Sequence, residues 1–342
     1  MKKFISLILS VIMLSITACG TVGEMPAFID AEKGTDTVDI YFIAGQSNAA
    51  GESRYETVSA ENVKPEHETG YENIYFYGCA LYWDEFGGNI HRTDELLPVT
   101  KGLGETSEWI GPELGMAEYL SQFYNEETGR KAIIVKYAAG AASLDGKTGN
   151  PWGNFCPPSL VAQGSVIEGS DEKNKDLYQN LIEVVSEVYA RCRYWGFKNV
   201  NLCGFFWSQG EAESYDLTRA ANYSNSLTAL VGDFRADLYK ITNDSDALKL
   251  PFVIGEICPS FNSTETVEVE GEVRSTNEGI NAVLDCQRKV ASELENVFTL
   301  PTGMYTLFAG VDGCLDGMHY AGDDALEIGR RAAEKLYTEA GK

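Results

Sequence analysis

The sequence predicts one α/β domain built on a mainly parallel, five-stranded sheet. Short, near-continuous runs of apolar residues alternate with segments whose apolar residues recur at helical spacing. Strands without polar alternation are typical of a sheet that helices cover on both faces. Their regular alternation with helices is typical of parallel βαβ units, so a single doubly covered sheet is expected.

Each predicted element follows from its local pattern. The strands are rich in Val, Ile, Leu and aromatic residues, and they span residues 38–44, 132–138, 200–207, 251–257 and 297–300. The helices carry apolar residues three or four positions apart, and they span residues 112–124, 177–188, 223–238, 280–290 and 326–336. Pro112 suits the first position of the first helix.

Three long connections separate these elements, over residues 52–110, 144–172 and 259–277. Connections of this length in a compact domain are usually functional or disordered. The first one holds a group of aromatic residues: Tyr71, Tyr75, Tyr77, Tyr82 and Trp83. These rings either stack on a sugar or form a local cap over the core, and the sequence leaves both roles open.

Composition narrows the range of partners. The 342 residues include 27 Lys and Arg against 51 Asp and Glu, a formal net charge of −24. This charge argues against nucleic acid, whose phosphates need neutralising, and against adsorption to anionic lipid. With 3 histidines and no HExxH or CxxC spacing, neither a metal nor a cofactor is expected. A secreted-side protein that acts on a neutral or small substrate fits best.

The N-terminal residues have the pattern of a signal peptide. Lys2 and Lys3 precede an apolar run over residues 4–16, which is too short to span a bilayer comfortably. The Ile-Thr-Ala-Cys segment that ends at Cys19 resembles a bacterial lipobox, in which the cysteine is lipidated. An ordinary signal peptide followed by an incidental cysteine is the alternative. The expected parts are a lipoprotein signal peptide, an acidic tether and the catalytic domain, over residues 1–18, 19–36 and 37–342.

This signal predicts secretion across the bacterial inner membrane and attachment at the cell surface, with membrane contact only through a lipid on Cys19. The other seven cysteines are Cys79, Cys156, Cys192, Cys203, Cys258, Cys286 and Cys314. Their odd number and wide spacing do not suggest a dense disulfide scaffold. Most are expected to be small buried hydrophobic residues.

A serine follows the first predicted strand directly, in the segment Gly45-Gln46-Ser47-Asn48-Ala49-Ala50-Gly51. Its hydroxyl is expected at the carboxyl edge of the sheet, where ligands of such folds bind. The segment is neither a GxSxG elbow nor a phosphate loop. Composition alone favours a serine that only caps a turn or a helix.

A serine nucleophile needs a base, and imidazole is the usual one. His67 and His91 lie in polar loop sequence and are expected to be solvated. His319 follows Asp316 by three residues, a spacing at which a carboxylate can orient the imidazole. A helix-capping aspartate beside a structural histidine is the alternative.

Two further segments end at the same predicted edge. Gln209 follows the third strand, and its amide could donate to an oxyanion. Glu211 and Glu213 could form an acid pair for glycoside hydrolysis, but residues two apart in an extended segment face opposite ways. Gly140 follows the second strand and could present a backbone N–H, which by itself is a weak signal.

Together these segments resemble one family. Gly45-Gln46-Ser47-Asn48, Trp207-Ser208-Gln209-Gly210-Glu211, Asp316-Gly317-Met318-His319 and Gly111-Pro112-Glu113-Leu114 are similar to motifs of the sialate O-acetylesterase-like carbohydrate esterases. These enzymes belong to the SGNH (GDSL) hydrolase superfamily, which includes acetylxylan esterases. The resemblance implies a flavodoxin-like three-layer α/β/α sandwich.

The resemblance also implies roles for individual residues. Ser47 would be the nucleophile, His319 the base and Asp316 its orienting acid. The oxyanion donors would be the Ser47 backbone N–H, Gly140 and Gln209, with Gln46, Asn48 and Glu211 in support. The sequence departs from the family pattern at Ala49, at Gly140-Ala141-Ala142 and at Glu213, which leaves the oxyanion glycine open without removing a catalytic group.

The expected function is therefore a serine esterase that removes O-acetyl groups from a carbohydrate through an acetyl-serine. Its partner would be an acetylated oligo- or polysaccharide. The acidic charge favours xylan or a related neutral plant glycan over O-acetylated sialic acid, although local charge can oppose net charge. A glycan-binding surface lipoprotein without catalysis is an alternative of another class. A lipase or thioesterase is disfavoured because no long apolar stretch lies near the site.

Overall fold

A computed structural model describes residues 37–81, 89–91, 95–146, 152–163, 176–263, 265–305, 307–309 and 315–341. For residues 89–91, 308–309 and 315–316 it describes the backbone only. The predicted signal peptide, the tether, Cys19, Tyr82, Trp83 and Cys314 lie outside the described residues.

The predicted sheet is present and is larger than expected. Within the described residues its strands run in the order β12-β9-β8-β1-β7-β3-β4, and β5 also pairs with β3. The parallel strands are β1 (Thr37–Gly45), β3 (Ile74–Leu81), β7 (Lys131–Ala139), β8 (Asn199–Ser208), β9 (Phe252–Gly255) and β12 (Val297–Leu300). The antiparallel ones are β4 (Asn89–His91) and β5 (Leu97–Pro98). Five of these strands, β1, β7, β8, β9 and β12, confirm the sequence prediction.

Strand β3 corrects the interpretation of residues 52–110 as one long connection. It lies beside β7 in the sheet, and its residues are mostly buried. Tyr77 is fully buried, Tyr71 is buried, and Tyr75 is half-buried. Of the two roles left open for the aromatic group, these three rings therefore serve the core.

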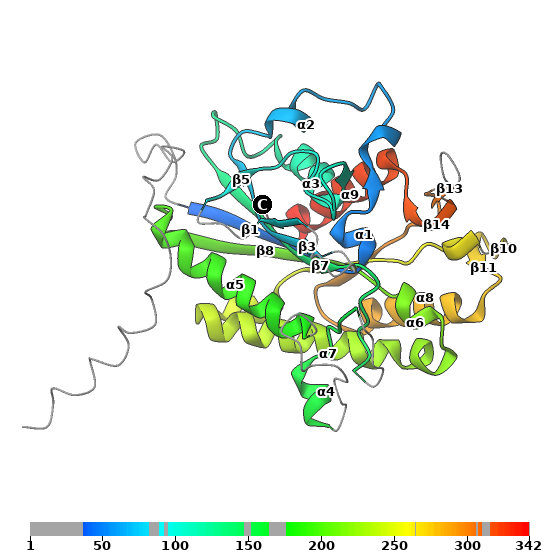
Figure 1. Cartoon of the computed structure of the whole chain (residues 1–342). Coiled ribbons are helices and arrows are strands. Elements are labelled where there is room, and N and C mark those ends of the chain that lie inside the picture. Colours follow the sequence, from blue (N-terminus) through cyan, green and yellow to red (C-terminus); the bar gives the residue numbers. More distant parts are fainter. Residues whose placement is uncertain are drawn as a thin grey trace, which may run out of the picture.

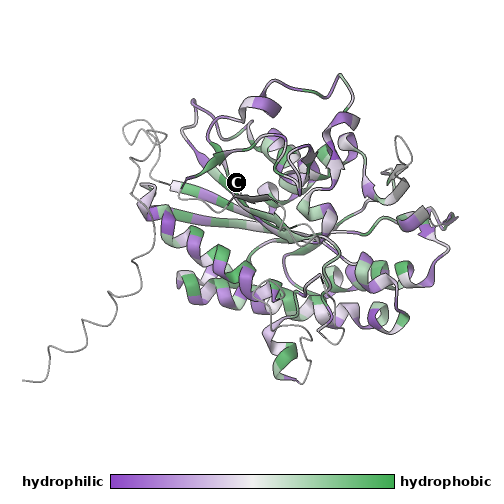
Figure 2. Ribbon diagram, in the orientation of Figure 1, coloured by the Kyte–Doolittle hydropathy of each residue, from purple (hydrophilic) through white to green (hydrophobic). Residues whose placement is uncertain are grey.

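Helices cover both faces of the sheet, which confirms the three-layer α/β/α architecture (Figure 1). One face carries α3 (Pro112–Leu120) and α9 (Gly322–Glu339), and the other carries α5 (Leu177–Tyr194), α7 (Leu217–Thr242) and α8 (Glu278–Glu293). Figure 2 shows the hydrophobic residues concentrated in the sheet between these layers. Side-chain caps fix three helix starts, because Asp176, Asp216 and Asn277 each accept a backbone N–H of the first turn.

The shorter elements lie in the connections and at the sheet edge. The helices are α1 (Ser47–Ala50), α2 (Glu66–Thr69), α4 (Pro158–Ala162) and α6 (Glu211–Ser214). The strands are β2 (Ser53–Arg54), β6 (Trp109–Ile110), β10 (Thr266–Val269), β11 (Glu272–Ser275), β13 (Leu307–Ala309) and β14 (Leu315–Tyr320). Short 3-10 turns span Tyr55–Thr57, Ser245–Lys249 and Phe261–Ser263.

Strand β1 lies between β7 and β8, so later strands of the chain are added to the sheet on both sides of it. Numbered along the chain, the six parallel strands of the described residues run 6-5-4-1-3-2. The flavodoxin order, 2-1-3-4-5, instead places the second strand beside the first. In open α/β sheets ligands bind beyond the carboxyl ends of the strands where their order reverses, which directs attention to the end of β1.

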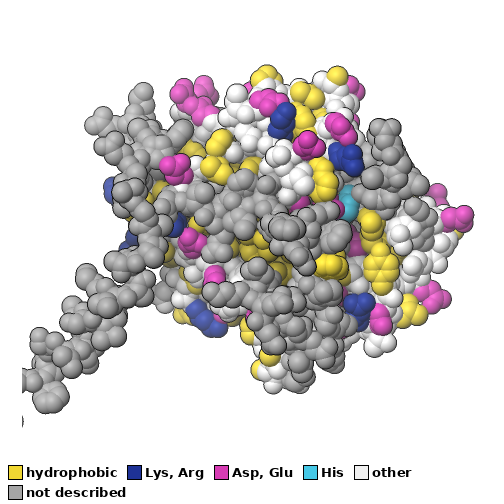
Figure 3. Space-filling view, in the orientation of Figure 1, with side chains coloured by type: hydrophobic (Ala, Val, Ile, Leu, Met, Phe, Trp, Pro, Cys, Tyr) yellow, Lys and Arg dark blue, Asp and Glu magenta, His cyan; other side chains and the backbone are white. Residues whose placement is uncertain are grey.

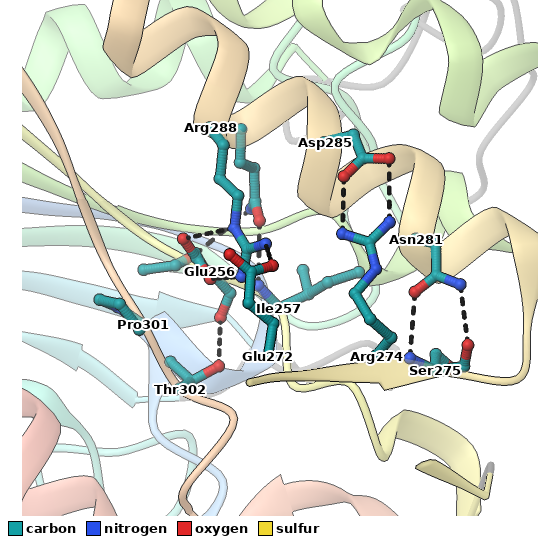
Figure 4. A network of polar contacts seen from close by, with 12 residues as sticks. Glu256, Ile257, Glu272, Arg274, Ser275, Asn281, Asp285, Arg288, Pro301 and Thr302 are labelled. Atoms are coloured by element: carbon teal, nitrogen blue, oxygen red, sulfur yellow. Dashed lines mark hydrogen bonds and ion pairs between the residues drawn. The ribbon is translucent and has the colours of Figure 1, made fainter. Parts of the chain in front are cut away.

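The third long connection contains an ordered hairpin, β10–β11, that charged side chains tie to α8 (Figure 4). Arg274 binds Asp285 through two contacts of 2.7 and 3.0 Å. Arg288 on α8 bridges Glu272 on the hairpin, at 2.6 Å, and Glu256 beyond β9, at 3.0 Å. This network fixes the hairpin, although the partly exposed pairs contribute little stability individually.

The cysteines that the structure describes are joined by no disulfide, and all but the half-buried Cys286 are buried. Burial raises the pKa of the Cys156 thiol to about 11 and that of Cys192 to about 12, as expected of inert core residues.

No helix in the described ranges is long and apolar enough to span a bilayer. The same residues contain no cluster of three or more His, Cys, Asp or Glu suited to holding a metal ion. Acidic side chains spread over the face in Figure 3, with fewer basic ones.

Candidate active site

Ser47 lies at the carboxyl end of β1, as predicted, and begins α1. Gly45 ends the strand at φ 140°, where a Cβ would collide with the Ser208 carbonyl oxygen, so the sharp turn requires glycine. The Gln46 N–H donates to that same oxygen at 3.0 Å. Ser47 is 6% exposed, and its N–H precedes the first hydrogen bonds of the α1 turn. It therefore stands among the N–H groups that a helix start leaves for an outside acceptor.

Asn48 links the serine segment to the histidine segment. Its Nδ2 donates to the Met318 carbonyl oxygen at 3.3 Å and to Glu211 Oε1 at 3.0 Å. Met318 directly precedes His319 on β14, and His319 is 8% exposed. One amide thus connects α1, α6 and β14, and the segments of Ser47 and His319 meet at one edge of the sheet.

Asp316 lies on the same strand as His319, but its side chain is outside the described atoms, so its orienting role stays a prediction. A carboxylate that the sequence analysis missed does contact the imidazole. His319 Nε2 lies 3.2 Å from Glu52 Oε2, and each side chain is 10% exposed. The signal available in the sequence was an acidic residue directly after Gly51, at the end of the serine motif.

Glu211 is buried, at 3% exposure. Burial raises the pKa of its carboxyl, while the hydrogen bond from Asn48 and the charge of His319 oppose that rise. Its Oε1 accepts the Asn48 amide, which fits the supporting role that the resemblance implies for both residues. Gln46 supports the same region, since its Oε1 accepts the N–H of Ala212 at 3.2 Å.

Gln209 does not present its amide to the site. The side chain is fully buried, and its Nε2 donates to the Ala142 carbonyl oxygen at 3.2 Å and to Glu213 Oε2. Glu213 also accepts the Ser143 hydroxyl and the Leu144 N–H, both at 2.7 Å. Both residues therefore anchor the turn after β7, and neither the oxyanion role of Gln209 nor a glycosidase acid pair is supported.

Gly140 is also engaged elsewhere. Its N–H donates to the Leu81 carbonyl oxygen at 3.0 Å, which extends the ladder between β7 and β3. This N–H is thus already engaged in the structure, and the oxyanion role of Gly140 stays a prediction. Of the three predicted donors, the Ser47 N–H is the one whose position fits that role.

The other two histidines do not reach this edge in any described contact. His67 was expected to be solvated, but it is fully buried, and its Nδ1 lies 3.1 Å from the Tyr55 hydroxyl. Burial, and then the charges of Lys64 and Arg330, lower the pKa of its imidazole to about 4. Short polar sequence around a histidine did not reveal that α2 folds inward. The side chain of His91 lies outside the described atoms.

The contacts of Gln209 lead to a test of its role. We expect Gln209→Ala to lower the melting temperature and to reduce kcat by the same factor on p-nitrophenyl acetate and on glycan, because it removes partners of Glu213 and Ala142. Losing a buried hydrogen-bond partner costs about 1–3 kcal/mol. An oxyanion donor would instead show a loss of about 10²- to 10³-fold in kcat at an unchanged melting temperature. A rise in KM for glycan alone would identify a sugar contact.

Comparisons with known proteins identify the family of the chain. Residues 37–338 match the family described as carbohydrate esterase, sialic acid-specific acetylesterase. No curated protein sequence matches the chain. Among solved structures, NanS has a TM-score of 0.57 at 14% identity, covering 89% of this chain and 98% of its own.

Two other solved structures share the fold. A protein from Arabidopsis thaliana has a TM-score of 0.55 at 16% identity, covering 88% of this chain and 98% of its own. A carbohydrate acetylesterase from Xanthomonas citri has a TM-score of 0.53 at 15% identity, covering 89% of this chain and 57% of its own. At such identities these similarities establish the fold, whereas the family match extends over most of the sequence. The chain therefore belongs to the carbohydrate esterase family of sialic acid-specific acetylesterases.

Proposed function

We propose that this carbohydrate acetylesterase is a serine esterase with Ser47 as nucleophile and His319 as base. The observation that supports the proposal is that Asn48 joins their two segments: Asn48 directly follows Ser47 at the start of α1, and its amide donates to the carbonyl oxygen of Met318, which precedes His319. His319 is 8% exposed. A nucleophile, a base and a backbone N–H at one sheet edge are the parts that acyl transfer needs.

The reaction follows from these parts. Ser47 Oγ attacks the acetyl carbonyl carbon while His319 takes the hydroxyl proton. The Ser47 N–H stabilises the oxyanion of the tetrahedral intermediate. His319 returns the proton to the departing sugar oxygen, which leaves an acetyl-serine. The imidazole then deprotonates water, and attack of that water releases acetate and restores Ser47. Asp316 is the predicted orienting acid.

A neutral plant glycan such as acetylated xylan is the substrate class we favour. The chain carries a formal charge of −24, and the described groups that interact with His319 include the carboxyl groups of Glu52 and Glu211, which add no positive charge to the site. Such a field disfavours an anionic sialoside.

One feature favours the alternative, a sialate O-acetylesterase. A pocket of about 570 Å³ lies where β2 meets β6, and its lining includes Arg54, Lys101, Tyr55 and Trp109. Arg54 follows Glu52 by two residues, so the pocket begins close to the histidine contact. Its rings could stack on a sugar, and its cations could bind a carboxylate, although each already pairs with a glutamate.

Acetate release from a panel of acetylated substrates tests the proposal. The panel contains acetylated xylan, O-acetylated sialic acid, p-nitrophenyl acetate and p-nitrophenyl octanoate, with Ser47→Ala as the blank. We expect release from xylan and from the acetyl ester. Preference for the sialoside would select the alternative substrate, and preference for octanoate would indicate a lipase or thioesterase. Glycan binding without any acetate release would identify the non-catalytic lipoprotein.

We also propose that a lipid on Cys19 anchors the protein at the cell surface. The support is the sequence around Cys19 and the apolar run before it. We expect Cys19→Ala to move the protein from the membrane fraction to the soluble fraction, or to block its processing, because acyl chains supply the membrane affinity. Wild-type protein found unlipidated in the culture medium would contradict the anchor.

A further inference from the structure

Two loop segments cross beside the proposed base. Glu52 directly follows Gly51, and Glu105 directly follows Gly104. The Glu105 N–H donates to the Gly51 carbonyl oxygen at 3.0 Å. A Cβ on Gly104 would collide with that oxygen, so the close crossing requires glycine there. The two acidic side chains therefore start from backbones that are held together.

A buried cation fixes both backbones. Lys136 on β7 is fully buried, and its Nζ donates to the carbonyl oxygens of Ala50 at 2.8 Å and Leu103 at 2.7 Å. Ala50 lies two residues before Glu52, and Leu103 lies two residues before Glu105. One ammonium group thus sets the spacing between the two acidic side chains.

The two carboxyl groups converge on one point. A Cβ added to Gly140 would lie 2.9 Å from Glu105 Oε1 and 3.1 Å from Glu52 Oε1. Glu105 is 2% exposed. Two neighbouring carboxylates in such a site do not both ionise at neutral pH. Burial, the charge of Glu52 and a hydrogen bond to Glu52 raise the pKa of Glu105 to about 10, while the charge of Lys136 opposes the rise.

We propose that Glu52 is the carboxylate that binds the His319 imidazole at Nε2, which leaves Nδ1 as the nitrogen that takes the Ser47 proton, and that Glu105 holds Glu52 against the ring. Glu52 thus takes the orienting role that the sequence predicts for Asp316. The inference rests on the proposed role of His319 as base. Glu52 Oε2 lies 3.2 Å from Nε2, within reach of a charge-assisted hydrogen bond. The protonated Glu105 carboxyl lies beside the other oxygen of Glu52, Oε1, so the pair holds a single negative charge. Glu52 and Glu105 are positioning residues, since they act through His319.

The consequence is a histidine whose charged form is favoured. An adjacent carboxylate stabilises imidazolium and thus raises the basicity of the imidazole. The same charge stabilises the imidazolium that forms when Ser47 gives up its proton. The titratable and charged groups of the region come from several elements, namely Glu52, Glu105, Glu113, Lys136, Glu211 and, on the same strand as His319, Asp316.

The first test is the pH dependence of kcat/KM on p-nitrophenyl acetate, with the pKa of His319 measured by NMR. We expect Glu52→Gln to move the acidic limb and the histidine pKa down by about one to three units. Its kcat on the alkaline plateau should also fall, because the base is weaker. Glu61→Gln makes the same chemical change at an exposed site and should leave both values unchanged. If Glu52→Gln does not fold, Glu52→Asp withdraws the carboxylate and should move the limb in the same direction.

Glu105 provides a matched pair of variants. Glu105→Gln keeps a neutral group whose N–H can donate to Glu52, so the limb should stay at its wild-type position. Glu105→Leu removes the donor, and the acidic limb of the pH profile should move.

The proton on Glu105 should also affect how the stability of the protein depends on pH. The unfolded chain ionises Glu105 above its ordinary pKa of 4.5, whereas the folded chain keeps the proton up to about 10. Wild-type stability therefore falls with rising pH in that window, and the advantage of Glu105→Gln should grow between pH 5 and pH 8.

The outcomes separate this inference from the proposed function. An acidic limb that stays in place or rises in Glu52→Gln, while Ser47→Ala is inactive, overturns the Glu52 role and leaves the esterase mechanism intact. A Glu105→Gln variant that loses ground to wild type as the pH rises overturns the shared proton. Activity retained in both Ser47→Ala and His319→Ala would instead remove the mechanism on which the inference rests.

Discussion

Replacement of Ser47 by alanine is expected to lower kcat for acetate release by about a million-fold, the size of loss seen when a serine nucleophile is removed. Ser47 is 6% exposed, and its backbone, not its hydroxyl, makes the contacts that close α1. The variant should therefore fold and melt like the wild type. His319→Ala should cause a loss of similar size, since neither group works without the other.

The double variant Ser47→Ala, His319→Ala tests whether the two residues act together. If Ser47 and His319 act as one unit, the combined substitution costs no more than either single one, because the second removes an already idle group. Steady-state kinetics on p-nitrophenyl acetate, with an acetate assay on glycan, measure all three variants. Near-normal release by Ser47→Ala would exclude the nucleophile, and losses that multiply in the double variant would show that the two residues act independently.

Much of the fold follows directly from local sequence. The five predicted strands are apolar on both faces, and burial on both faces is what the sheet gives them. Strand β3 was not predicted, because Tyr75, Tyr77 and Gly78 weaken its apolar pattern. Tyrosine suits a sugar platform and a core equally well, since it has a large ring and one polar tip. Only the pairing of Ile74–Leu81 with β7 decides between them.

For the candidate site as well, part could be predicted from the sequence and part could not. Ser47 and His319 follow from their places beside predicted strands and helices, because the carboxyl ends of parallel strands meet at one edge. The same reasoning located Gln209 correctly but not the direction of its amide. That direction depends on Glu213 and on Tyr223, whose hydroxyl donates to Gln209 Oε1 at 2.9 Å. Partners on other elements leave no spacing signal.

The contact between Glu52 and Glu105 is the part of the site that the sequence predicts least. They are 53 positions apart in a region that looked like loop, and no periodicity links them. Their meeting depends on Lys136, which resembles an ordinary charged interruption of an apolar strand. A lysine in such a strand must find partners or lie at an edge, because a buried ammonium without partners is costly. That argument predicts partners for Lys136, but it does not name them.

Removal of Lys136 should have the largest effect on stability that we expect in this chain. Its Nζ lies 2.8 Å from Glu113 Oε2, and both side chains are fully buried. Lys136→Met keeps a similar volume but leaves the Glu113 carboxylate without its cation, which costs about 3–5 kcal/mol. The carbonyl oxygens of Ala50 and Leu103 lose their donor as well. Urea unfolding of the wild type and the variant, monitored by circular dichroism, measures the difference in the free energy of unfolding.

The double variant Lys136→Met, Glu113→Leu distinguishes the buried charge from the lost hydrogen bonds. Removing both charges relieves the unpaired carboxylate, so the double variant should be more stable than Lys136→Met alone. It should still be less stable than the wild type, because the Ala50 and Leu103 oxygens remain without a donor. A substitution at Lys335, whose side chain is 39% exposed and pairs with Glu339, controls for loss of a lysine and should change stability by less than about 1 kcal/mol.

The same variants connect stability to catalysis. Because Lys136 fixes the backbones beside Glu52 and Glu105, the double variant should remain impaired in turnover even at temperatures where it is fully folded. Its acidic limb should move in the same direction as that of Glu52→Gln, since the carboxylate is no longer held against His319. A double variant that unfolds more easily, but whose folded form has a wild-type pH profile, would show that Lys136 stabilises the fold without positioning the base. A Lys136→Met variant as stable as the wild type would contradict the buried pair itself.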